Sequence, residues 1–118
     1  MYGDLLIDHF KNPRNVGELA RPAVTIEVSN PICGDILRLS VRFDQDTVAE
    51  ARYKTRGCTA SIAAGSALTV WMAGKTKPEL GSFRPSMIEE LLGVLQPESK
   101  HVAVLCADAL KSLLKAAL

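Results

Sequence analysis

Three cysteines, two histidines and a nearby aspartate are the side chains in this sequence whose types could do metal or sulfur chemistry. Cys33 lies in the run Pro31-Ile32-Cys33-Gly34-Asp35, between two predicted strands. Gly34 frees the backbone of this turn, and Asp35 places a hard oxygen ligand close to a soft sulfur ligand. The turn therefore predicts that Cys33 and Asp35 can both reach a metal ion.

Cys58 follows Arg56-Gly57 at the predicted start of a helix. The positive end of the helix dipole, together with Arg56 or Lys54, favours the thiolate, which is the form that binds metal or accepts sulfur. A free cysteine can instead be a small buried apolar side chain. Because Cys33 and Cys58 both lie in glycine turns outside regular elements, we interpret them as functional.

His101 and Cys106 are more ambiguous, because both lie in the last predicted helix. His101 opens that helix, where a histidine can be a surface or capping residue as well as a ligand. Cys106 shares an apolar stripe with Val102 and Ala109, so a packed core thiol fits it as well as a ligand does. No C-x-x-C pair, H-E-x-x-H motif or glycine-rich phosphate loop occurs, so any metal site must be assembled from distant segments.

The elements that would position these residues can be predicted from hydrophobic periodicity. A short helix over Asp4–Lys11 places Leu6, Ile7 and Phe10 on one stripe and ends at Asn12-Pro13. Alternating apolar and polar residues predict one strand over Val24–Ser29 and two antiparallel strands over 37–43 and 49–54, joined by a turn at 44–46.

Helices are expected after the strands. The small residues of Thr59–Ala73 suggest a helix that packs closely on the sheet and ends at Gly74. A short helix over Pro85–Leu92 follows, and the last helix has an apolar stripe of Val102, Leu105, Cys106, Ala109, Leu113 and Ala117. This order predicts an α+β fold, a three-stranded antiparallel sheet with an N-terminal helix and the helices packed on one face.

Composition restricts the classes of function. The 118 residues are enough for a single domain over 1–118, and 47% hydrophobic with 23% charged residues is ordinary globular usage. Fourteen Lys and Arg against thirteen Asp and Glu, scattered along the chain, predict no nucleic-acid binding. Neither a membrane-spanning run nor a secretory signal is visible, so we expect a cytoplasmic protein in which an odd number of cysteines argues against a disulfide framework.

Several motifs together resemble one family. The sequence resembles the IscU/NifU N-terminal type of iron-sulfur cluster assembly scaffold, in the SufE/NifU superfamily, over nearly the whole chain. The matching runs are Asp8-His9-Phe10-Lys11-Asn12-Pro13-Arg14-Asn15-Val16-Gly17, Cys33-Gly34-Asp35, Tyr53-Lys54-Thr55-Arg56-Gly57-Cys58, Trp71, Gly74-Lys75-Thr76 and Ala107-Asp108-Ala109-Leu110. The resemblance implies a scaffold that receives sulfur from a cysteine desulfurase, builds a [2Fe-2S] or [4Fe-4S] cluster, most readily [2Fe-2S], and transfers it to apo-proteins.

The resemblance also implies a ligand set of three cysteines and an aspartate, which zinc can occupy as well. Cys33, Asp35 and Cys58 match this set, whereas His101 falls on the histidine of the family and Val102 on its third cysteine. Cys106 lies one turn later, a displacement of about 6 Å along a helix axis. That is more than twice a metal–sulfur bond of about 2.3 Å. Either a shifted helix brings Cys106 to the site, or His101 completes a mixed site that suits zinc or a labile cluster.

Three functions follow from these expectations. The first is a non-enzymatic scaffold whose weak carboxylate ligand eases release of the cluster, with a cysteine desulfurase and recipient apo-proteins as partners. The second is a zinc-binding or cluster-free regulatory paralogue that docks on the desulfurase, and the third is a zinc-dependent sulfur-transfer partner. The run Leu95-Gln96-Pro97-Glu98-Ser99 departs from the Leu-Pro-Pro-Val-Lys sequence of some members, so an Hsp70-type chaperone is not supported as a partner. We expect a monomer or weak dimer with no membrane partner.

Overall fold

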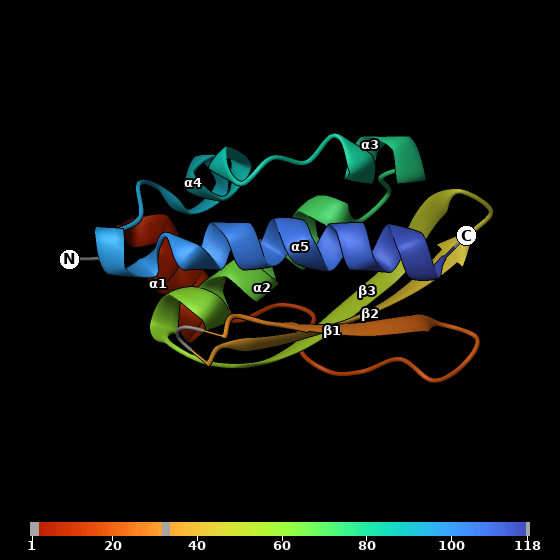
Figure 1. Ribbon diagram of the computed structural model, residues 1–118, viewed down its shortest axis with the longest axis horizontal. Helices are drawn as coiled ribbons and strands as arrows, with labels where there is room; N and C mark the ends of the chain where they lie inside the picture. Colours follow the sequence, from red (N-terminus) through yellow and green to blue (C-terminus); the bar gives the residue numbers. More distant parts are fainter. Residues whose placement is uncertain (1–2, 32–33, 118) are drawn as a thin grey trace.

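Three antiparallel strands, β1 (Val24–Ser29), β2 (Ile36–Asp44) and β3 (Thr47–Arg56), form a sheet in the order β1-β2-β3 (Figure 1). The computed structural model describes residues 3–31 and 34–117. Leu37, Leu39 and Val41 are buried on one face of β2, and the residues between them lie on the other face. The three predicted strands are confirmed, and β2 and β3 extend a few residues beyond the predicted bounds.

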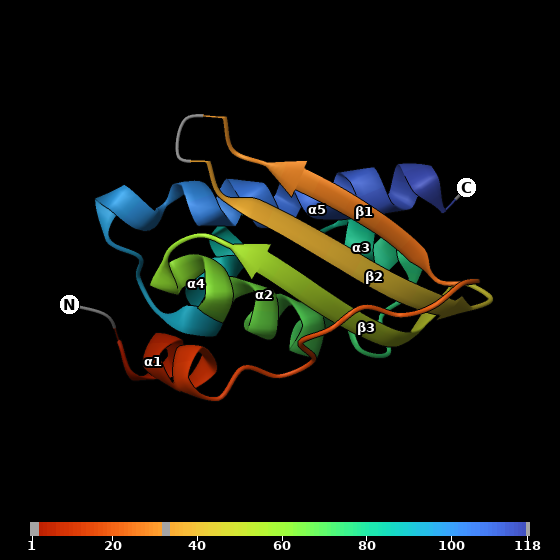
Figure 2. The same ribbon diagram turned by 90° about the horizontal axis from the view of Figure 1, so that it is seen from below.

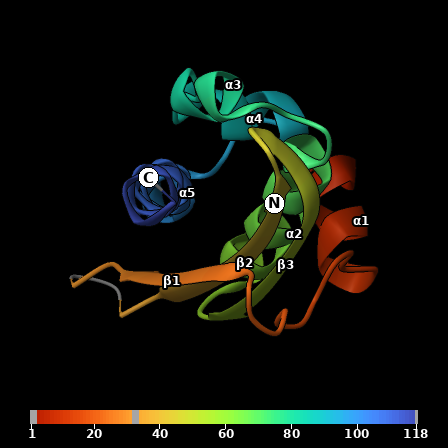
Figure 3. The same cartoon turned by 90° about the vertical axis from the view of Figure 1, so that its right-hand side faces the viewer.

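Two helices cover the core face of the sheet. Helix α2 (Thr59–Met72) packs on β3, and helix α5 (His101–Ala116) packs on β1 and β2 (Figures 1 and 3). Helix α1 (Asp4–Lys11) lies against α2, and α3 (Lys77–Gly81) and α4 (Ser86–Leu92) lie against α5. The predicted α+β class is therefore confirmed. Within the described residues, no helix has both the length and the apolar character needed to cross a bilayer.

The small residues of α2 allow its backbone to approach the sheet closely. A Cβ atom on Gly65 would lie 2.4 Å from two ring carbons of Tyr53, so only glycine fits at this contact. The Tyr53 hydroxyl donates a hydrogen bond of 2.8 Å to the carbonyl of Ile62. The helix ends at Met72, and Gly74 follows with φ of +79°. The predicted close packing and the predicted terminating glycine are both confirmed.

Two details differ from the sequence-based expectation. Of the predicted stripe on α1, Leu6 is 1% exposed but Phe10 is 38% exposed, so only part of the stripe is buried against the domain. Helix α3 was not predicted. It begins with a capping box in which Thr76 and Glu79 bond to each other's backbone amides, and this T-x-x-E pattern is its sequence signal. A 3₁₀ turn (Pro97–Ser99) also precedes α5.

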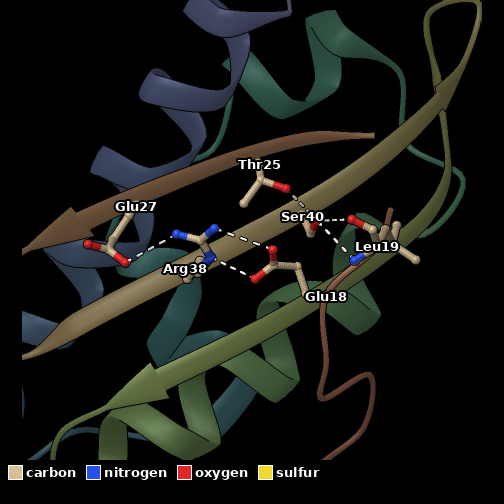
Figure 4. Close-up of polar contacts among 6 residues, drawn as sticks. All are labelled: Glu18, Leu19, Thr25, Glu27, Arg38 and Ser40. Carbon is tan, nitrogen blue, oxygen red and sulfur yellow. Dashed lines mark hydrogen bonds and ion pairs between the residues drawn. The ribbon is translucent and has the colours of Figure 1, made fainter. Parts of the chain in front are cut away.

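Residues 12–23, here called the strap, run from α1 along β3 towards the start of β1 (Figure 2). The backbone of Tyr53 bonds to Asn15 and Gly17 of the strap, at 2.9 Å in each case. Farther along, Glu18 accepts a bond of 2.7 Å from Arg38, which also pairs with Glu27 at 3.5 Å (Figure 4).

The strap is also bonded to the sheet through Ser40. The backbone amide of Leu19 donates to the Ser40 hydroxyl at 3.1 Å, and the hydroxyl lies 2.7 Å from Thr25 (Figure 4). Because Ser40 alternates with Leu39 and Val41, the strap covers the face of the sheet opposite α2 and α5. The two faces of the sheet are thus covered differently, one by apolar helices and the other by a polar, extended segment.

Candidate metal centre

Three ligand-type side chains from distant parts of the sequence meet at one end of the sheet. Asp35 precedes β2, Cys58 precedes α2, and His101 opens α5. One ligand atom from each of these residues lies within 4.8 Å of the other two. The structure therefore brings together three of the residues that the sequence analysis selected.

Local backbone structure places each of these side chains. The turn before Asp35 is closed by bonds from Gly34 to the Asn30 carbonyl at 2.7 Å and from Asn30 to the Asp35 carbonyl at 2.8 Å, and Gly34 has φ of +75°. Cys58 is the N-cap residue of α2, and its carbonyl accepts the first backbone bonds of the helix. A side chain at a helix N-terminus projects beyond the helix end, which brings Cys58 and His101 towards the turn that holds Asp35.

The Asp35 carboxylate is the centre of the cluster. Its Oδ2 atom lies 2.9 Å from His101 Nε2 and 3.8 Å from Cys58 Sγ, and it also accepts a bond from the Ser61 hydroxyl. Asp35 is only 6% exposed. Burial alone would raise the pKa of its carboxyl, but the bonds from Ser61, His101 and Cys58 outweigh burial and hold this pKa below its ordinary value. Asp35 is therefore an anion at neutral pH.

Gly57 and Ser61 complete the site, and the sequence analysis did not assign a role to either. A Cβ atom on Gly57 would lie 2.7 Å from Asp35 Cγ and 2.9 Å from Ser61 Oγ, so the absence of a side chain makes room for the carboxylate. Ser61 Oγ lies 3.3 Å from Cys58 Sγ. The available signal for Ser61 was its place in the first turn of the helix after Cys58, where side chains point back towards the N-terminus.

Two candidates from the sequence analysis remain, Cys33 and Cys106. Cys33 is outside the described residues. Cys106 is 1% exposed in the apolar core, where burial raises the pKa of its thiol to about 12. In the part of the chain that the structure describes, the Cys106 sulfur is not among the clustered ligand atoms. Helix α5 begins at His101, so Cys106 lies about 7.5 Å farther along the axis, and the structure shows no shift that would bring it to Asp35.

Val102 is also part of the core, at 1% exposed. It follows His101 directly in α5, so two adjacent side chains lie in different places, His101 at the cluster and Val102 in the core. An apolar side chain offers no donor atom to a metal. Of the last helix, His101 is therefore the residue that the structure brings to the site.

The donor set of this site is mixed. A carboxylate oxygen, a thiolate sulfur and an imidazole nitrogen are all ligands of zinc, and thiolate and imidazole both bind iron. The three side chains bond to one another through Asp35 Oδ2, so they share one small space rather than facing separate directions. This arrangement fits the chemistry of a metal centre.

Comparison with known proteins identifies the family of this chain. The NifU-like N-terminal domain family matches residues 1–116. The chain is 41% identical to the iron-sulfur cluster assembly scaffold protein IscU of Azotobacter vinelandii, over 97% of this chain and 91% of that protein. It is 38% identical to the IscU scaffold of Haemophilus influenzae, over 94% of this chain and 90% of that protein.

Solved structures show the same fold. A candidate iron-sulfur cluster assembly scaffold for the SUF system of Fervidobacterium islandicum aligns with a TM-score of 0.81 at 22% identity, over 96% of each chain. The N-terminal part of a NifU-like protein from Brucella abortus aligns with a TM-score of 0.77 at 16% identity, over 97% of this chain and 92% of that one. The family match over residues 1–116, together with the sequence identity to the two IscU scaffolds, shows that the chain belongs to the NifU-like N-terminal domain family.

Proposed function

We propose that this protein is a scaffold on which a transient iron-sulfur cluster is built and from which it is transferred to apo-proteins. The observation that carries the proposal is the convergence of Asp35, Cys58 and His101, in a chain whose relatives are named as iron-sulfur cluster assembly scaffolds. The cluster is cargo in this proposal and not a resident cofactor, so the protein is classed as a scaffold and not as an enzyme.

The donor set supports a role in release as well as in binding. A permanent cluster is usually held by four thiolates. Here a carboxylate and an imidazole stand beside Cys58, and the carboxylate already bonds to Ser61 and His101. Because a carboxylate oxygen binds zinc or iron less strongly than a thiolate sulfur does, Asp35 can act as an exchangeable ligand.

We assign the fourth ligand to Cys33, two residues before Asp35 in the sequence. The proposed set is then Cys33, Asp35, Cys58 and His101, without Cys106. A [2Fe-2S] cluster is the proposed cargo, zinc can occupy the same ligands, and a cysteine desulfurase and recipient apo-proteins are the proposed partners.

A specific observation favours a second candidate, a zinc-binding paralogue that docks on a cysteine desulfurase and regulates it. Val102 stands at the position that the family resemblance assigns to a third cysteine, and it is buried in the core. A chain without that thiol has one fewer site for incoming sulfur. This candidate predicts binding of the desulfurase and of zinc, but no cluster.

The test is anaerobic reconstitution with iron, cysteine, a thiol reductant and a cysteine desulfurase, followed by measurement of iron and acid-labile sulfide per chain. We expect the native protein and Cys106→Ala to incorporate both, and His101→Ala to lose them. Loss in Cys106→Ala alone would show that α5 supplies its cysteine from a different register. Zinc without sulfide in all three proteins would refute the scaffold and support the regulatory paralogue.

A further inference from the structure

Ser61 is the side chain that connects two proposed ligands of the metal centre, Asp35 and Cys58. Its hydroxyl donates to Asp35 Oδ2, and its oxygen lies 3.3 Å from Cys58 Sγ. It belongs to the first turn of α2, whose N-cap residue is Cys58. One helix turn therefore supplies both a proposed ligand and a hydrogen-bond donor to another proposed ligand.

This contact is enclosed by the protein. Ser61 is 3% exposed and Asp35 is 6% exposed, so water has little access to either side chain. The missing Cβ of Gly57 leaves the space through which the Asp35 carboxylate and the Ser61 hydroxyl approach each other. A hydrogen bond to a charged acceptor is stronger than one between neutral groups, and more so where water is excluded.

We propose that Ser61 is a positioning residue of the metal centre, which holds the Asp35 carboxylate in the orientation that faces Cys58 and His101. This inference rests on the proposed metal centre, but not on the building of a cluster. Ser61 acts through Asp35 and is not itself a ligand. The role adds a residue that the ligand pattern of the sequence does not contain.

The energetic reason is preorganisation. A carboxylate that is already held in place loses less rotational freedom when a metal binds than one that can rotate. Groups that orient a metal ligand typically change metal affinity by about 10- to 100-fold when they are removed. Without the Ser61 hydroxyl, Asp35 keeps its contacts with His101 and Cys58 but loses its hydroxyl donor from the first turn of α2.

The first measurement is the affinity of Ser61→Ala for Co²⁺ and Zn²⁺, determined by competition with a chelator. We expect affinity to fall by about 10- to 100-fold, while the thiolate-to-cobalt charge-transfer band persists because Cys58 is intact. Alanine favours helix, so α2 is expected to form, and circular dichroism checks this. The matched control is Ser66→Ala, which removes another buried serine hydroxyl from α2 but lies in a different polar cluster. It should bind both metals with native affinity.

A double-mutant cycle with Asp35→Ala separates positioning from other roles. If Ser61 acts through Asp35, Ser61→Ala has no further effect on metal affinity in the Asp35→Ala background. Native affinity in Ser61→Ala, or an equal loss in the Asp35→Ala background, would overturn the proposal. Because the probe is a metal ion alone, this result is independent of whether the native protein assembles sulfide into a cluster.

Discussion

Helix α2 supports two polar clusters of similar composition, one at its first turn and one near its middle. At the first turn, Ser61 bonds to Asp35, beside His101. Near the middle, Ser66 lies 2.7 Å from Nδ1 of His9. Both serines are buried and each cluster contains a histidine, so composition alone does not show which cluster binds a ligand.

The second cluster, here called the clasp, consists of His9, Arg14, Asn15, Ser66 and Thr69. The Arg14 backbone amide donates to Ser66 at 3.0 Å, and its guanidinium lies 3.1 Å from the same nitrogen of His9 that faces Ser66. Asn15 donates to Thr69 at 3.2 Å. These bonds join α1 and the strap to α2.

The difference between the clusters lies in the charge next to each histidine. His101 faces an anion, Asp35, and the two side chains together carry lone pairs that could bind a cation. His9 faces the Arg14 guanidinium, and burial together with this positive charge lowers its pKa. The Arg14 guanidinium thus lies beside the His9 nitrogen that a metal ion would have to approach. The comparison indicates that the charge next to the histidine distinguishes the candidate metal centre from the structural hydrogen bonds of the clasp. The presence of a ligand-type residue does not, because both clusters contain a histidine.

The largest expected effect is on metal binding. Cys58→Ala removes a proposed ligand and should lower Zn²⁺ affinity by more than the roughly 10- to 100-fold typical of groups that only orient a ligand. His9→Gln, in the clasp, should leave Zn²⁺ affinity unchanged. Isothermal titration calorimetry compares the two proteins. Equal losses in both would show that the clusters are not functionally distinct.

The two glycines that allow close approach provide the next test. Gly57→Ala would press a Cβ against Asp35 and Ser61, so metal affinity should fall about 10- to 100-fold. Gly65→Ala would press a Cβ against the Tyr53 ring, and overpacking should lower the free energy of unfolding by about 1–3 kcal/mol. Both variants are measured by chelator competition and by urea unfolding. The larger loss of metal affinity is expected in Gly57→Ala, and the larger loss of stability in Gly65→Ala. A metal defect in a folded Gly65→Ala protein would contradict this separation.

The clasp should contribute stability without contributing to metal binding. Ser66→Ala leaves the Arg14 amide and His9 Nδ1 without their buried partner, which typically costs about 1–3 kcal/mol. Urea unfolding measures this loss. Ser82→Ala, which removes an exposed hydroxyl, is the control and should stay within about 0.5 kcal/mol of native. A native-like Ser66→Ala protein would indicate that the clasp bonds are energetically neutral.

The smallest effect concerns pH. Burial and the Arg14 charge hold the pKa of His9 in the folded protein below its ordinary value of about 6.5, so the unfolded chain binds the proton more tightly. The contribution of His9 to stability is therefore complete above about pH 6.5 and is lost as pH falls below it. Unfolding free energies between about pH 7.5 and 5.5 should decline less in His9→Gln than in the native protein. Identical slopes would exclude His9 as the source.

The clasp also explains why part of the family motif was not informative about chemistry. The run from Asp8 to Gly17 helped to identify the resemblance, but its polar side chains bond to α2 and β3 rather than to the metal centre. Within the run itself, Asp8 pairs with Arg14 at 2.8 Å. A sequence motif therefore marks a requirement of the fold as readily as a requirement of the site.

The sequence by itself predicted the three strands and the long helices, because apolar periodicity and turn residues are local signals. It also identified Asp35, Cys58 and His101 as candidates by residue type. It could not choose between His101 and Cys106, because both lie on one helix and the choice depends on where α5 begins relative to Asp35. Only the tertiary structure places His101 beside that carboxylate and Cys106 in the core.

Ser61 and Gly57 were decided by tertiary structure in the same way. A serine in a helix and a glycine before a cysteine have no chemical signature in sequence. Their roles arise because α2 and the turn at Asp35 meet with too little space for a Cβ and with one hydroxyl facing one carboxylate. Local sequence determines which elements form, whereas the contacts between distant elements determine which polar side chains share a site.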